Sequence, residues 1–177
     1  VIRLAESVWK PFDGLCHPEG RRTLRKAVLG CFVEFEERRD DLGLTFTYRW
    51  APAARFGFVR TVTIGLDADS PPLRFDVLDG LRGLLPAGVD LLTQQRASTL
   101  ADAFKRAELD RETGLGIYAL EARIGDRPEP SESLRANVVW SRGIEAESIL
   151  MGSRQADAFC AGHRLHPEPL CTGERGA

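Results

Sequence analysis

Several features that would identify a class of protein are scarce or missing in this sequence of 177 residues. No apolar run exceeds five residues, whereas a membrane-spanning helix needs about 20. The net charge is only −2, so the basic excess typical of nucleic-acid-binding proteins is missing. The 17 Gly and 10 Pro show no period, which excludes collagen-like and low-complexity chains. The hydrophobic fraction of 43% and the charged fraction of 28% are instead typical of a soluble globular protein.

Cysteine is also sparse, and no two cysteines stand in C-x-x-C spacing. The four are Cys16, Cys31, Cys160 and Cys171. Four cysteines are too few for a disulfide scaffold in a chain of this size, so we expect reduced thiols in a cytoplasmic protein. Because the sequence starts at Val1 and stops abruptly after Ala177, we also expect it to be a segment of a longer chain.

Alternation of apolar and polar residues predicts strands over much of the chain. The clearest segment is 42–50, in which every second residue is apolar, and 56–66 repeats the pattern. Together with the β-rich run 28–37, these segments predict a three-stranded antiparallel meander. The same alternation predicts further strands in three places, at 73–77, 116–124 and 134–140.

Helical patterns are fewer. Residues 98–109 predict one convincing helix, and short helical pieces are expected at 81–85 and 155–159. The sequence therefore predicts a mainly β (all-β) fold, an antiparallel two-sheet sandwich with one crossing helix. We expect 1–27 to be a loop segment that leads into a sandwich domain over 28–160, with 161–177 as an irregular tail.

One possible metal site occurs near the end of the chain. Zinc prefers four ligands of the Cys and His type in a tetrahedron, and C-x2-H-x2-H-x4-C offers four: Cys160, His163, His166 and Cys171. The spacing matches none of the usual zinc-finger patterns, so we favour incidental cysteines and surface histidines. We expect no metal and no cofactor.

Sugar-binding proteins commonly stack aromatic rings on the C–H faces of pyranoses. Trp50 ends the best strand beside Arg49 and Arg55, and Trp140 ends another. These four are candidate substrate-binding residues, with packing at a strand end as the alternative. The close carboxylate pairs are Asp76 with Asp79, Glu129 with Glu132, and Glu34 with Glu36. We interpret them as solvated or turn residues, and we predict no catalytic residue.

Four stretches of the chain resemble a known group of proteins. They are Tyr48–Arg60, Leu78–Pro86, Arg127–Leu134 and Val138–Ser141. In this order they are similar to the N-terminal β-sandwich region of large bacterial cellobiose-phosphorylase-like proteins, relatives of the inverting glycoside phosphorylases. The resemblance covers about 28–160.

The resemblance implies an enzyme with a β-supersandwich, a helical linker and an (α/α)6 barrel. Phosphate then attacks the anomeric carbon of a β-glucoside while an aspartic acid on the barrel protonates the leaving oxygen. That acid lies beyond this chain, so we expect a non-catalytic domain that shapes one wall of the site. Expected partners are a β-linked glucoside held with the catalytic domain and a second subunit, but neither nucleic acid nor membrane. The alternatives are a free-standing glycan-binding module and, less favoured, a small zinc-binding domain.

Overall fold

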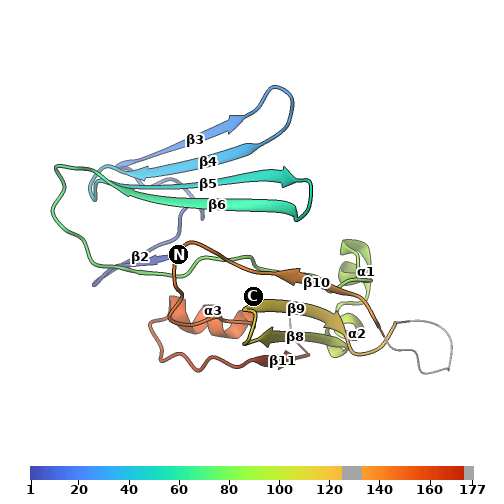
Figure 1. The fold of residues 1–177 in the computed structure, drawn as a ribbon. Helices are drawn as coiled ribbons and strands as arrows, with labels where there is room; N and C mark the ends of the chain where they lie inside the picture. The colour runs from blue at the N-terminus through green and yellow to red at the C-terminus, as the bar shows by residue number, and fades with distance from the viewer. Residues whose placement is uncertain (125–132, 174–177) are drawn as a thin grey trace. The chain divides into compact units, whose positions relative to one another are not determined.

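The computed structural model describes residues 1–124 and 133–173. Strands account for 37% of the chain and helices for 12%, which confirms the prediction of a mainly β fold. Over the described ranges the strands form three antiparallel sheets, accompanied by three short helices (Figure 1). Among these residues no helix has the length and apolar character needed to cross a membrane. The chain divides into two compact units, Val1–Val77 and Leu78–Ala177, which are described in turn.

The first unit is built on a four-stranded meander in the order β3-β4-β5-β6. Its strands are β3 (Gly20–Lys26), β4 (Val33–Arg39), β5 (Leu44–Ala53) and β6 (Gly57–Leu66). The predicted meander over 28–66 is therefore confirmed as β4-β5-β6. A smaller sheet in the order β2-β1-β7 joins β1 (Ile2–Arg3), β2 (Val8–Trp9) and β7 (Asp76–Val77).

The core of the first unit lies on one face of the meander. Period-2 alternation in β5 places Leu44 and Phe46 on this face, where they pack against Ile2 and Trp9. Each of these side chains contributes about 1.5–3 kcal/mol when fully buried. Phe12 extends the core with an aromatic cluster, since its ring meets Tyr48 edge-on at 5.1 Å between centroids. The N-terminal segment thus covers the sheet.

The second unit contains a four-stranded sheet in the order β10-β9-β8-β11. The elements of this unit are α1 (Leu91–Arg96), α2 (Ser98–Ala103), β8 (Lys105–Asp110), β9 (Leu115–Leu120), β10 (Ala136–Val139), α3 (Ser153–Cys160) and β11 (Leu170–Thr172). Its core has two parts. Ala107, Tyr118, Met151 and Cys171 form one, and Val89, Ala101 and Leu120 form the other.

The prediction of a helix over 98–109 is correct only as far as Ala103. Helix α2 ends there, and β8 begins at Lys105. The burial pattern of β8 begins with the period of a strand, because Lys105 and Ala107 are buried and Arg106 between them is exposed. Pairing with both β9 and β11 gives this segment two hydrogen-bonded neighbours that a helix would not have. Long-range pairing decides its conformation.

Other expectations also changed. Residues 81–85, expected to be helical, are not helical. The first helix is α1, and its N-terminus is capped by the Asp90 carboxylate, which accepts a hydrogen bond from the Thr93 N–H at 2.7 Å. Residues 1–27, expected as a leading loop, contain β1, β2 and β3. The strand β3 shows no apolar alternation because it is an edge strand with arginines on both faces. The expected irregular tail contains β11.

Candidate functional site

The candidate sugar-binding residues of the first unit lie at the end of β5 and in the turn after it. Trp50 is half-buried on the same face as Phe46, and in the strand register it stands between Val33 of β4 and Arg60 of β6. Arg49 points to the opposite face, where its guanidinium lies 3.9 Å from the centroid of the Phe32 ring. The sheet therefore separates Trp50 from Arg49, although the two are adjacent in sequence.

The register brings a different set together. Phe58 pairs with Pro52, one row nearer the turn than Trp50 and on the same face, and it is 75% exposed. Arg60 stands directly beside Trp50, with its guanidinium carbon 5.1 Å from the centroid of the Tyr48 ring. We call Trp50, Phe58 and Arg60 the aromatic row. Phe58 and Arg60 were not identified as candidates from the sequence, although pairing 42–50 with 56–66 in register would have found them.

Arg55 lies in the β5–β6 turn and is exposed, with its guanidinium carbon 5.8 Å from the Phe56 ring centroid. Trp140 belongs to the second unit, directly after β10, and its side chain is exposed. It is therefore a separate candidate and not part of the aromatic row.

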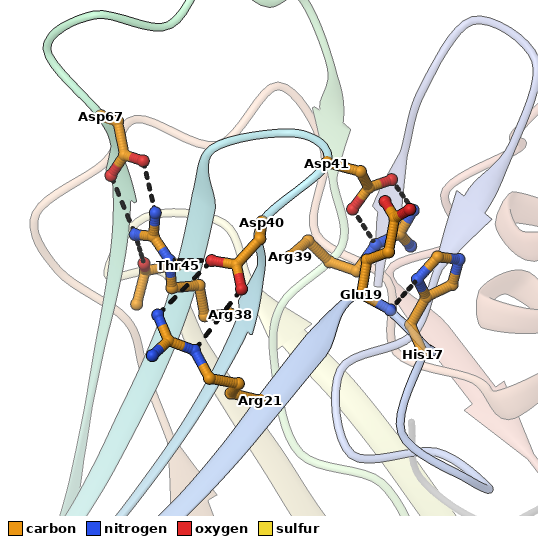
Figure 2. Close-up of polar contacts among 9 residues, drawn as sticks. All are labelled: His17, Glu19, Arg21, Arg38, Arg39, Asp40, Asp41, Thr45 and Asp67. Carbon is orange, nitrogen blue, oxygen red and sulfur yellow. Dashed lines mark hydrogen bonds and ion pairs between the residues drawn. The ribbon is translucent and has the colours of Figure 1, made fainter.

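The opposite end of the meander carries a network of charged residues around the β4–β5 turn (Figure 2). Arg38 donates two hydrogen bonds to Asp67, at 2.9 and 2.5 Å, and a third to Asp40 at 2.5 Å. These bonds hold the pKa of Asp67 below its ordinary value and raise the pKa of Arg38. Arg39 similarly lowers the pKa of Asp41 by hydrogen bonding. This network ties the β4–β5 turn to the segment after β6.

The turn itself depends on glycine. Gly43 has a φ of +61°, and a Cβ built there would lie 1.9 Å from Ser70 Oγ and 3.1 Å from Ser70 Cβ. A larger residue would therefore meet both backbone strain and a steric clash. The charged network and this close approach together fix the loop after β6 against the turn.

A buried carboxylate belongs to the core of the first unit. Glu37 is only 2% exposed and accepts hydrogen bonds from three donors: Arg22 Nε at 2.8 Å, Trp9 Nε1 at 3.3 Å and the Phe12 backbone N–H at 2.5 Å. Phe12 has a φ of +66°, a strained conformation for a bulky residue. Because the carboxylate joins Trp9 and Phe12 of the N-terminal segment to β4, Glu37 holds that segment on the sheet.

The second unit has a comparable buried cation. Lys105 Nζ donates to Gln94 Oε1 at 2.5 Å and to Asp102 Oδ1 at 2.6 Å, and its side chain is buried. These bonds connect α1, α2 and β8, so Lys105 joins the helices to the sheet. A hollow of about 420 Å³ lies on the other face of the sheet, lined in part by Ile117, Glu121 and Leu134.

Of the close carboxylate pairs in the sequence, Asp76, Glu34 and Glu36 bind arginines. Asp76 binds Arg3 at 2.7 Å, and Glu34 and Glu36 both bind Arg25, at 2.9 and 3.1 Å. Asp79 is exposed. Glu129 and Glu132 lie outside the described residues.

The possible zinc ligands are dispersed. Cys171 is buried in the core beside Tyr118, Cys160 ends α3, and His163 and His166 are exposed. Across 1–124 and 133–173, no three His, Cys, Asp or Glu side chains are placed to hold a metal ion. The side chain of Cys171 packs as a small hydrophobic group, which explains why the four residues do not converge.

Comparison of the chain with protein-family models and with curated proteins finds no match. The fold class therefore rests on the sheets described above, and the function is inferred from the side chains and their contacts.

Proposed function

We propose that this chain is a non-catalytic β-rich part of a carbohydrate-active enzyme similar to the inverting glycoside phosphorylases that act on β-glucosides. Its role is to present a sugar-contacting surface, while a separate catalytic domain supplies the acid. The proposal continues the resemblance carried by Tyr48–Arg60 and Leu78–Pro86. It also keeps the cytoplasmic location expected from the sparse cysteines.

The observation that carries the proposal is the aromatic row. The register places the side chains of Trp50 and Phe58 on one face of the β5–β6 hairpin, with Arg60 alongside Trp50. Rings of this kind stack on the C–H faces of a pyranose, and a guanidinium donates hydrogen bonds to sugar hydroxyls. Phe58 is exposed enough for a ligand to reach it. An open sheet face with these groups is better suited than a deep pocket to the binding of an extended glucan.

The carboxylates support an accessory role. Glycosidic bond cleavage by a pair of carboxyl groups needs them on opposite sides of the scissile bond, about 5–10 Å apart. Glu34 and Glu36 instead share one strand face and bind the same arginine, Arg25. Asp40, Asp41 and Asp67 are likewise ion-paired around a turn. These carboxylates therefore stabilise the folded chain through ion pairs with arginines.

Two measurements test the proposal. The first incubates the chain with cellobiose and phosphate; we expect no glucose 1-phosphate and no hydrolysis, and either product would contradict a non-catalytic role. The second titrates tryptophan fluorescence with cello-oligosaccharides; we expect a saturable change. Substitution Phe58→Ala should weaken this binding by about ten-fold, the effect of losing one well-packed ring.

A matched control is Leu15→Ala, because Leu15 is 96% exposed and outside the aromatic row. It should leave the titration unchanged. No fluorescence change at saturating sugar, or equal weakening by both variants, would refute the aromatic row as a sugar surface. Loss of binding in Trp140→Phe with retention in Trp50→Phe would move the site to the second unit. Tight binding by this chain alone, unchanged when a catalytic domain is supplied, would favour the free-standing glycan-binding module.

A further inference from the structure

The two hairpin turns of the meander expose apolar residues to an unusual degree. Val28 and Leu29, at the tip of the β3–β4 hairpin, are 100% and 94% exposed. Phe56, in the β5–β6 turn, is more than half exposed. Single exposed apolar residues are ordinary, but adjacent and fully exposed aliphatic side chains at a projecting tip indicate a binding surface.

Both turns lie at the same end of the sheet, which we call the hairpin end (Figure 1). The antiparallel register places Val33, just after the first turn, opposite Trp50, near the second. The first turn is closed by hydrogen bonds from Ala27 N–H to Phe32 C=O at 3.1 Å and from Gly30 N–H to Ala27 C=O at 2.9 Å. The backbone therefore holds Val28 and Leu29 at the tip.

The hairpin end is also basic. The strand register places five basic residues in or near the two turns: Arg25, Lys26, Arg49, Arg55 and Arg60. Lys26, Arg49 and Arg55 form no ion pair with any residue in the described parts of the chain. The nearest carboxylates, on Glu34 and Glu36, are both bound by Arg25. The acidic residues Asp40, Asp41 and Asp67 lie at the other end of the meander. The hairpin end therefore carries more cations than carboxylates.

We propose that the hairpin end docks on an anionic lipid surface. Val28 and Leu29 enter the boundary between headgroups and acyl chains, and the surrounding cations contact acidic headgroups. A protein partner is less suitable, because each side of a stable interface usually buries about 800 Å². The exposed side chains of Val28, Leu29, Phe56 and Phe58, at about 100 Å² each, offer about half of that. A fluid bilayer also accepts projecting tips without a complementary groove.

This proposal does not rest on the proposed function, and it differs from the expectation that no membrane is a partner. That expectation came from the short apolar runs of the sequence, none longer than five residues, which exclude a membrane-spanning helix. Docking at a surface needs no membrane-spanning helix.

Co-sedimentation of the full chain with vesicles tests the proposal. We expect binding to vesicles of phosphatidylcholine with phosphatidylserine, weakening as salt is raised, and little binding to phosphatidylcholine alone. The double variant Val28→Asp/Leu29→Asp should weaken binding by more than about ten-fold, because it places charges where apolar groups enter the lipid. Lys26→Gln should weaken it by about five-fold, the contribution of one cation near an anionic surface.

The matched control is Leu15→Asp, which adds a charge at a fully exposed position away from the hairpin end. It should bind vesicles as the unchanged chain does, apart from a small effect of net charge. Failure to bind anionic vesicles at low salt would overturn the proposal, as would equal binding by the double variant or equal binding to neutral vesicles. A dimer that the double variant converts to monomer, without vesicle binding, would show instead that a second copy covers these tips.

Discussion

Glu37 offers the most direct test of how the first unit is held together. Replacement by alanine removes the acceptor from two donors at the core, the Trp9 indole N–H and the Phe12 backbone N–H. Each buried donor left without a partner costs about 1–3 kcal/mol. Arg22 is assigned no cost, because its side chain is 27% exposed and its guanidinium can turn to water. The free energy of unfolding should therefore fall by about 2–6 kcal/mol.

Urea unfolding, followed by tryptophan fluorescence and far-UV circular dichroism, measures this loss. With an m-value near 2 kcal/mol/M, the midpoint should decrease by about 1–3 M. Glu37→Gln keeps one acceptor oxygen and should give an intermediate loss. The reduction is a large part of the roughly 5–15 kcal/mol that stabilises an ordinary domain.

The control is Glu36→Ala, which removes a neighbouring carboxylate whose ion pair with Arg25 is at the surface. Such pairs contribute about 0–1 kcal/mol. Should Glu37→Ala lower the midpoint no more than Glu36→Ala does, the buried carboxylate does not hold the N-terminal segment on the sheet, and the reasoning fails.

Two further predictions concern the charged end of the meander. Gly43→Ala should lower the free energy of unfolding by about 1–3 kcal/mol, more than Gly57→Ala does. Both glycines have a positive φ, but only Gly43 lies against Ser70. Equal urea midpoints for the two variants would contradict this prediction. The second concerns pH. Arg38 lowers the pKa of Asp67 in the folded state below its ordinary value, so the unfolded chain binds more protons. Stability therefore falls as the pH drops from about 5 toward the folded-state pKa. Urea midpoints of Asp67→Asn should fall less steeply over this range than those of the unchanged chain, and identical slopes would show that the ion pair contributes nothing.

Local patterns predicted part of the fold well. The segment 42–50 has an apolar residue at every second position, and Leu44 and Phe46 are core residues of β5. Helix α3 is also where 155–159 predicted it. In these segments the local pattern and the tertiary contacts agree, so the pattern alone was sufficient.

The candidate site was only partly predictable. Trp50 was identified from its position at a strand end, but its neighbours Phe58 and Arg60 come from the next strand and required the hairpin register. Arg49 was grouped with Trp50 by adjacency, although successive residues of a strand point to opposite faces. The possible zinc ligands were close in sequence, yet Cys171 joins the core through β11.

Side-chain periodicity and turn composition were enough to establish a mainly β chain with an antiparallel meander, because they reflect which face of each strand is buried. Contacts between distant segments determined the rest. They converted Lys105–Asp110 from an expected helix to a strand, buried Glu37 beneath a segment expected to be loop, and collected apolar tips and cations at one end of a sheet. Such features depend on pairing energy between residues far apart in the chain, which no local pattern records.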